Sequence, residues 1–334
     1  VQSEDMKLLR SSRRAADLRN NNTDLVIIVF FAIMLGIVAL LSGSVFHRTL
    51  NKKRIYKQRV SSVFMFILTI SSVLLLVSMI VGLFWKSMPI LQENSFWSLV
   101  TSSEWKPSQK KFGFLPFISG TLSVTFIAIC IALPLSILTA ISLTEYSKKV
   151  VRKFVYPALD ILAALPSVIY GVWGILLLIP VTGYSLITAA LVLCVMVLPI
   201  MVSLFVEIFS SVPQDLRDAS MALGATQWQT TKNVVLRKSL SGIFAAVVLA
   251  LSKAMGETIA VMMVCGSIPT IPKSLFKGFY TLPALIGNNY GEMASVPLYE
   301  SAIMFAALLL LAIVIIFNVL SRIILYNVQK KSQS

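Results

Sequence analysis

The chain has 334 residues, of which 57% are hydrophobic and 13% are charged, and its mean hydropathy is +0.85. A soluble protein of this length would carry about twice that share of charged residues, so the composition excludes a soluble globular protein and indicates a membrane protein. The formal net charge of +15 would suit a nucleic-acid-binding protein, but the basic residues gather between the apolar stretches. Basic residues placed in this way indicate the topology of a membrane protein and not a nucleic-acid-binding surface. We therefore expect no nucleic-acid partner.

Apolar stretches long enough to cross a bilayer recur along the chain. A spanning helix needs about 20 mostly apolar residues. In chain order, the stretches that qualify are 25–46, 60–85, 117–143, 156–180, 184–207, 239–265 and 299–325. The sequence therefore predicts an all-α polytopic membrane protein in which each of these stretches is one helix.

Lysine and arginine residues are concentrated in alternate connections between these stretches. The connections 47–59, 144–155 and 208–240 are basic, as is the C-terminal end, whereas 86–116 and 266–298 hold fewer basic residues. Because positively charged loops stay in the cytoplasm, the basic connections are predicted to be cytoplasmic. The chain would then begin outside and end inside.

The predicted domains follow this pattern. They are a polar tail (1–24), a first transmembrane helix (25–46), a basic cytoplasmic linker (47–59), a transmembrane domain (60–325) with a cytoplasmic loop at 208–238, and a cytoplasmic C-terminal tail (326–334). The first tail carries basic and acidic residues, which conflicts with a place outside the membrane. A hairpin or another unusual placement of helix 25–46 would remove that conflict.

The sequence offers no pattern of catalytic or metal-binding residues. Its three cysteines, Cys130, Cys194 and Cys265, lie in or at the end of apolar stretches, and the single His47 lies in a basic loop. No phosphate-binding loop of the GxxxxGK[ST] kind, serine elbow or HExxH pattern is present. We therefore expect no metal, no cofactor and no enzymatic activity of its own, so the energy source must be a partner or an ion gradient.

Two opposite charges lie near the middle of the apolar stretch 239–265. Lys253 and Glu257 are four residues apart, so they would share one face of a continuous helix. A charge at bilayer depth costs ~3 kcal/mol or more and usually faces a protein interior or a polar pathway. The pair is either a self-neutralising ion pair or a site of anion passage, to which the hydroxyl of Thr258 would add. That hydroxyl is equally compatible with bonding back to its own helix.

The connection 208–240 is too long for a simple turn between two helices. Pro213 can start a helix, acidic residues occupy the first turns where the helix dipole favours them, and Gly224 can end it. Apolar residues recur at helical spacing and would form one face of this helix: Leu216, Ala219 and Leu223. The sequence predicts a short amphipathic cytoplasmic helix and a second helix from about Thr226.

This loop resembles the EAA loop of ABC importer permeases, whose pattern is E-A-A-x-x-x-G-x9-I-x-L-P. The matching positions are Asp218, Ala219, Ser220, Gly224, Val234 and Leu236, while Arg237 stands at the Pro position. The resemblance implies a helix that docks into an ATPase subunit and transmits its closure. The residues that it marks for coupling are Asp218, Ala219, Ser220, Leu223, Gly224 and Ala225.

Other segments resemble the permease subunits of the phosphate-specific (Pst) importer, in particular the C type. These segments are GFLPFISGTLSVTFIAICIALPLSILTAISLTEYS, PALDILAALPSVIYGVWGILLLIP and SKAMGETIAV. The C type typically reads R-A-x-G-E-T-M-A-V at the last of them, so Lys253 stands in place of the family's Arg. The resemblance covers roughly 60–325. It implies a six-helix core of the type I ABC importer fold, with helix 25–46 as an addition.

The resemblance implies a permease subunit that moves inorganic phosphate by alternating access across the cytoplasmic (inner) membrane of a prokaryote. Its partners would be a sister A-type permease, an ATPase dimer that binds ATP, an extracytoplasmic phosphate-binding protein and membrane lipid. The pathway would include Lys253, Glu257 and Thr258. The alternatives are a permease for another oxyanion such as sulfate or molybdate, a gradient-driven carrier, and a membrane signalling subunit that senses through helix 25–46 and its tail.

Overall fold

The computed structural model describes residues 55–293 and 297–333. The predictions for the tail 1–24, for helix 25–46 and for most of the linker 47–59 lie outside the described residues. The chain divides into two units, 1–85 and 86–334, and each is described by itself.

A single helix, α2 (Ile55–Glu93), makes up the described part of the first unit and continues into the second. Its segment Val63–Glu93 is long and apolar enough to cross a membrane. The span predicted at 60–85 therefore extends further, and it brings Lys86 into the helix beside the apolar residues.

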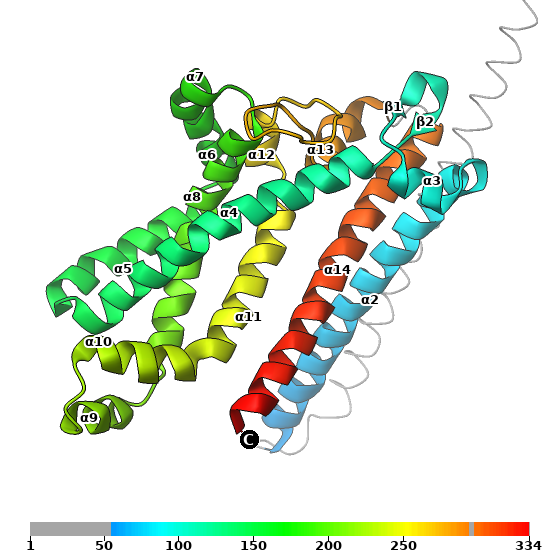
Figure 1. Cartoon of the computed structure of the whole chain (residues 1–334). Coiled ribbons are helices and arrows are strands. Elements are labelled where there is room, and N and C mark those ends of the chain that lie inside the picture. The colour runs from blue at the N-terminus through cyan, green and yellow to red at the C-terminus, as the bar shows by residue number, and fades with distance from the viewer. Residues whose placement is uncertain (1–54, 294–296, 334) are drawn as a thin grey trace, which may run out of the picture. The chain divides into compact units, whose positions relative to one another are not determined.

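The second unit is helical apart from one small hairpin, which lies at one end of it (Figure 1). In chain order the elements are α3 (Phe96–Thr101), β1 (Trp105–Lys106), a 3-10 turn (Pro107–Gln109), β2 (Lys111–Phe112), α4 (Leu115–Ile141), a π-helical turn (Ser142–Tyr146), α5 (Lys149–Ala164), α6 (Ser167–Trp173), a π-helical turn (Gly174–Leu178), α7 (Ile179–Thr182), α8 (Leu186–Ser210), α9 (Gln214–Ala222), α10 (Gln227–Thr230), a π-helical turn (Thr231–Val235), α11 (Leu236–Met255), α12 (Ile259–Val264), α13 (Leu282–Met293) and α14 (Pro297–Gln333).

Five helical segments of the described residues meet the length and hydropathy of a membrane span, and one bent pair supplies a sixth. The five are Val63–Glu93, Leu115–Tyr146, Leu186–Ser210, Gln227–Met255 and Leu298–Ile323, and the bent pair is Lys149–Ala164 with Ser167–Thr182. This agrees with the six-helix core expected for 60–325.

The bent pair corrects the prediction of one continuous helix over 156–180. Helices α5 and α6 meet at 93°. Leu165 takes an extended conformation, with ψ at 136°, because the ring of Pro166 disfavours a helical residue before it. The hydroxyl of Tyr170 closes the corner by donating to the carbonyl oxygen of Leu162 at 2.6 Å.

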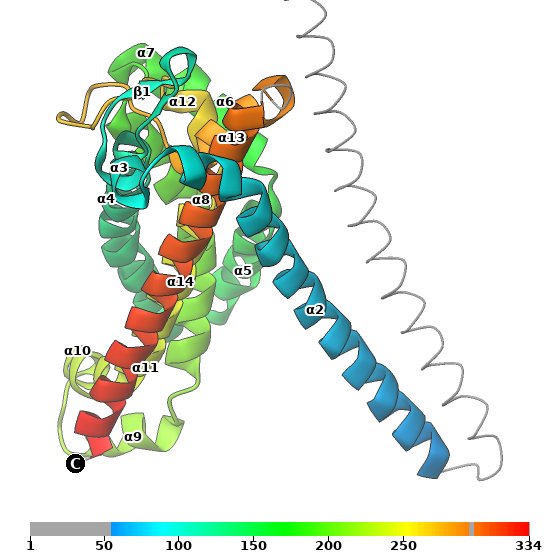
Figure 2. The same cartoon turned by 90° about the vertical axis from the view of Figure 1, so that its right-hand side faces the viewer.

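Helices α4 and α8 pack together along their length and form the centre of the second unit. Small residues on both helices are fully buried there and let the backbones approach closely: Ala128, Ala132, Ala189 and Ala190. Figures 1 and 2 show α9 and α10 at one end of these helices and α12, α13 and the hairpin at the other.

The hairpin end is held by aromatic packing around Trp105. Its ring lies 4.9 Å from that of Phe117 and 6.1 Å from that of Tyr299, measured between centroids. The Lys111 ammonium donates to the Glu104 carboxylate at 2.8 Å and holds the pKa of that carboxyl below its ordinary value. These contacts tie the hairpin to the starts of α4 and α14.

We expect Gly120→Ala to destabilise this end of the protein by about 2 kcal/mol, because the added methyl would overlap the carbonyl group of Tyr280 and force the backbone apart. Thermal unfolding of the purified protein in detergent measures the loss. Ser119→Ala, one residue away, removes only a hydroxyl that donates to its own helix at Pro116 and is the matched control. Equal melting temperatures for the two variants would contradict this packing.

Candidate functional site

The apolar segment that carries Lys253 is broken. Helix α11 ends at Met255, Gly256 caps it, and α12 begins at Ile259. The backbone N–H of Glu257 turns back to the carbonyl oxygen of Ala254 at 3.3 Å. The prediction of one helix over 239–265 is therefore wrong, as is the expectation that Lys253 and Glu257 share one helix face. Glycine weakens a helix at this point because its backbone is the most flexible.

The side chains at the break serve the two helix ends. The Glu257 carboxylate accepts a hydrogen bond from the N–H of Ala260 at 3.3 Å, and so satisfies a free donor at the start of α12. The hydroxyl of Thr258 donates to the carbonyl oxygen of Gly256 at 3.3 Å. Lys253 is exposed and makes no ion pair with any of the described residues. The self-neutralising pair is thus not formed.

Helix α13 lies against this break. A Cβ at Gly287 would stand 2.9 Å from the side-chain methyl of Thr258, so glycine is what permits the contact. Helix α13 is held in turn by Asn289, which accepts from the Tyr299 hydroxyl at 2.9 Å. The structure therefore brings Thr258 against α13, while Glu257 binds the start of α12 and Lys253 lies in the last turn of α11.

At the opposite end of the second unit, the short helix predicted within the loop 208–238 is present as α9. It begins after Pro213 and ends at Ala222, and Gly224 follows in the left-handed region with φ at +86°. Thr226 starts the next helix, α10, through a capping box with Gln229. The start, the stop and the second helix agree with the sequence prediction.

The predicted apolar face of α9 points away from the protein. Leu216 is 39% exposed and Leu223 is 90% exposed, while the residue that α9 buries is Arg217, at 8%. The helical face predicted from Leu216, Ala219 and Leu223 is therefore present and exposed, and the opposite side of α9 is the buried one. The reason is that a guanidinium group carries five N–H donors, and the structure supplies acceptors for them.

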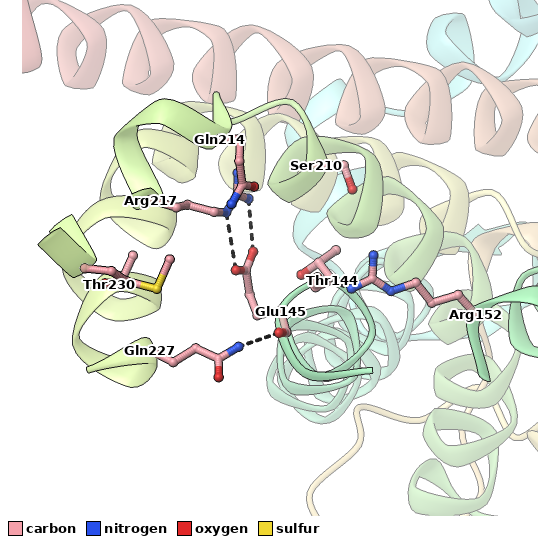
Figure 3. A pocket seen from close by; sticks show the side chains of 9 residues that line it. Thr144, Glu145, Arg152, Ser210, Gln214, Arg217, Gln227 and Thr230 are labelled. Atoms are coloured by element: carbon pink, nitrogen blue, oxygen red, sulfur yellow. Dashed lines mark hydrogen bonds and ion pairs between the residues drawn. The ribbon is translucent and has the colours of Figure 1, made fainter. Parts of the chain in front are cut away.

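The acceptors of Arg217 come from two transmembrane helices. Its guanidinium donates to the two carboxylate oxygens of Glu145 at 3.0 and 3.3 Å (Figure 3). It also donates to the carbonyl oxygen of Phe209 at 2.8 Å and to that of Val212. Glu145 belongs to the π-helical turn after α4, and Phe209 to the end of α8. Arg217 therefore ties α9 to both central helices.

Sequence reasoning missed Arg217 and Glu145. Arg217 precedes the EAA-like residues but looks like one more surface charge of a basic loop, and its partner lies 72 positions earlier in the chain. The only local signal is that Arg217 lies on the face opposite to Ala219 and Leu223. A buried fork-to-fork pair of this kind is specific in geometry, since both partners are planar.

The other predicted coupling residues divide into two groups. Ser220 and Ala225 are partly buried, and the hydroxyl of Ser220 lies 3.0 Å from that of Thr230, which joins α9 to α10. Four residues are exposed at the surface of the loop: Asp218, Ala219, Leu223 and Gly224. The loop is thus a braced protrusion with an apolar tip.

A cavity of about 320 Å³ lies behind this protrusion. Side chains from α5, α8, α9, α10 and the turn after α4 line it (Figure 3). They are Thr144, Glu145, Arg152, Ser210, Gln214, Arg217, Met221, Gln227 and Thr230. Among the described residues, no group of His, Cys, Asp and Glu side chains has the arrangement of a metal site.

Comparison with known proteins gives one family and several relatives. Residues 132–333 match the model of the binding-protein-dependent transport system inner membrane component. The phosphate transport system permease protein PstC of Xylella fastidiosa is 32% identical over 77% of this chain and 86% of its own length. PstC of Mesorhizobium japonicum is 34% identical over 70% and 80%. A probable ABC transporter permease, YqgH of Bacillus subtilis, is 36% identical over 67% and 75%.

Solved structures share the fold. A chain of a bacterial ABC transporter involved in the import of alginate superposes with a TM-score of 0.56 at 17% identity, covering 81% of this chain and 99% of that one. A chain of the MetNI methionine ABC transporter, in an inward-facing conformation, gives 0.53 at 22% identity, covering 63% and 93%. These likenesses concern the arrangement of helices.

We expect Arg217→Ala to release α9 from α8 and from the turn at Glu145. Removing one partner of a buried ion pair costs about 3 kcal/mol, which corresponds to a roughly hundredfold rise in local opening. Hydrogen exchange of the segment 209–224 measures that rise. Lys232→Ala removes an exposed charge from the same loop region and should leave the exchange unchanged. Equal exchange in both variants would show that the pair does not hold the helix.

Proposed function

The chain belongs to the family of binding-protein-dependent transport system inner membrane components, and from this premise we propose that it is the C-type permease subunit of an ABC importer for inorganic phosphate. It is a multi-pass protein of the cytoplasmic (inner) membrane and a transport subunit, without a catalytic role of its own. Relatives named as phosphate transport permeases align with most of its length, and this similarity supports phosphate as the cargo.

The observation that carries the proposal is the braced protrusion formed by α9. An exposed leucine tip is costly in water and is suited to a partner's groove, and Leu223 is 90% exposed. We assign this tip to a separate ATPase subunit that binds and hydrolyses ATP. Because Arg217 joins α9 to the ends of α4 and α8, a push on the tip reaches the centre of the transmembrane domain instead of bending a loose loop.

The anion pathway in this proposal runs past the break between α11 and α12. The exposed Lys253, without a carboxylate partner among the described residues, offers an ammonium with three donors. The Glu257 carboxylate can accept a hydrogen bond from the P–OH of phosphate, a group that sulfate lacks at neutral pH. Thr258 adds a hydroxyl. Irregular backbone at membrane depth is tolerated where it lines a polar cavity, which fits residues 256–258.

The proposed assembly contains a sister A-type permease, an ATPase dimer and an extracytoplasmic phosphate-binding protein. Alternating access requires a second permease, because the exposed side of Lys253 needs a facing wall to form a closed pathway. A gradient-driven carrier would have no use for an exposed protrusion such as α9. A permease for another oxyanion keeps every feature except the match between Glu257 and the P–OH proton.

ATP-dependent uptake of radiolabelled phosphate into proteoliposomes holding this chain and its partners tests the cargo and the pathway together. We expect uptake that excess sulfate does not inhibit and that Lys253→Ala lowers at least about tenfold, because a charge-assisted contact is lost. Lys149→Ala removes an exposed charge far along the chain from the break and is the control. Inhibition by sulfate would show that the cargo is not specifically phosphate. Full uptake by the Lys253→Ala variant would show that this lysine is not part of the pathway.

A second test addresses the tip of α9. Leu223→Asp should weaken co-purification of the ATPase about thirtyfold and abolish ATP-dependent uptake, because a charge replaces a buried apolar anchor. Leu223→Met keeps an apolar tip of similar volume and should retain both properties. If the aspartate variant retained the ATPase and its uptake, the assignment of this tip to the ATPase would fail.

A further inference from the structure

The cavity behind α9 contains a guanidinium group whose charge no carboxylate balances. Arg152, near the start of α5, donates to the carbonyl oxygen of Thr144, while its Nε–H is buried without a hydrogen-bond partner. Arg152 forms no salt bridge with any of the described residues. Most of its five N–H donors are thus unused by the protein. A partly buried cation in this situation favours an anion beside it.

The rest of the cavity wall adds to this preference. Arg217 lies on the α9 side, where Glu145 already pairs with it, so two guanidinium groups meet a single carboxylate. Neutral polar side chains complete the wall: Thr144, Ser210, Gln214, Gln227 and Thr230. Four of them are already hydrogen-bonded within the protein, Gln214 to Asp218, Gln227 to the carbonyl oxygen of Glu145, Thr144 to the carbonyl oxygen of Ala140 and Thr230 to Ser220. The lining is therefore positive and polar, and the donors of Arg152 and the hydroxyl of Ser210 face it together with one acceptor carboxylate.

This cavity lining fits a phosphate group that carries a proton better than it fits an anion without one, such as sulfate. A phosphate group that carries one proton needs several donors around its charged oxygens and an acceptor for its P–OH, and the Glu145 carboxylate lies in the same cavity. Arginine is suited to the task because its planar fork matches two phosphate oxygens. The cavity, at about 320 Å³, leaves room for the group together with ordered water.

We propose that the cavity between Arg152 and Arg217 binds a phosphate group on the cytoplasmic side, at the base of the coupling protrusion. The cavity is lined by residues of the two basic connections 144–155 and 208–240, so the group comes either from free inorganic phosphate or from the headgroup of an anionic lipid. Inorganic phosphate would donate to Glu145 through its P–OH, whereas the phosphodiester of phosphatidylglycerol has no P–OH and its glycerol hydroxyl would donate instead. The choice of inorganic phosphate as the free ligand rests on the proposed function. A group held there would brace α9 against α5 through both arginines.

Hydrogen exchange of the complete transporter in lipid nanodiscs, without nucleotide and without the binding protein, tests the site. One arm uses phosphatidylcholine alone with added inorganic phosphate, and the other uses phosphatidylglycerol-containing discs without it. We expect protection of the segments 142–152 and 210–230 in at least one arm, and that arm identifies the source. No protection in either arm would overturn the proposal, as would equal protection by added sulfate.

Variants of Arg152 show whether the protection belongs to this cavity. Arg152→Gln should raise the ligand concentration for half-protection about tenfold, and Arg152→Lys, which keeps the charge but not the fork, should raise it less. Lys149→Gln lies in the same turn of α5 but outside the cavity and should not shift it. If the glutamine variant fails to fold, the lysine variant decides, and unchanged half-protection in the folded variant would overturn the site.

Phosphate uptake into proteoliposomes of the same transporter, compared with the protection measured in nanodiscs, separates this proposal from the importer assignment. Phosphate uptake without protection of the two segments overturns the cavity site alone. Protection of the two segments without phosphate uptake supports the cavity site and contradicts the assignment of the chain to a phosphate importer.

Discussion

The buried pair between Arg217 and Glu145 is the contact on which the α9 end of this protein depends. Both side chains are about nine-tenths buried, at 10% and 8% side-chain exposure, and they join segments that are 72 positions apart. Without that pair, α9 would lose its link to the turn after α4 and would keep the bonds from Arg217 to the end of α8 and the contact between Ser220 and Thr230. With it, the exposed tip, the cavity and the ends of α4 and α8 form one mechanical unit. A permease that is moved by a partner needs such stiffness more than it needs thermodynamic stability, since buried ion pairs are weak stabilisers.

The sequence predicts those features whose signals are local. Hydropathy locates the spans from the first described helix to the last, and the Pro213, Thr226 and Gly224 signals locate the start, the next cap and the stop of the cytoplasmic helices. The two breaks within the membrane-spanning segments, at Pro166 and Gly256, are not predicted by local signals. Proline and glycine are common inside membrane helices, where neighbouring groups satisfy the backbone, so their presence at 166 and 256 does not announce a break. Their effect depends on tertiary contacts such as the one from Tyr170 to Leu162.

The candidate site residues show the same limit. Lys253 and Glu257 stand out in the sequence because charge is rare at membrane depth, and that reasoning selects the right segment. Helical spacing then suggests a shared face, which the turn at Gly256 removes. On α9, periodicity predicts the apolar face but not its direction. The acceptors offered by Glu145, Phe209 and Val212 explain why the side that carries Arg217 is the buried one.

The π-helical turn Thr231–Val235 has a consequence for how this chain can vary in length. It lies between α10 and α11, and a π-helical turn holds one residue more than the α-helix around it. Loss of a single residue here would let the segment close into a regular α-helix, and the later positions of α11 would keep nearly the same orientation relative to α10, because the extra residue is absorbed within the turn. Loss of a residue within the regular part of α11 would instead rotate the positions after it, Lys253 among them, by about 100°. The π-helical turn is therefore the place between α10 and the break at Gly256 where the chain can shorten by one residue and still present Lys253 to the same neighbours.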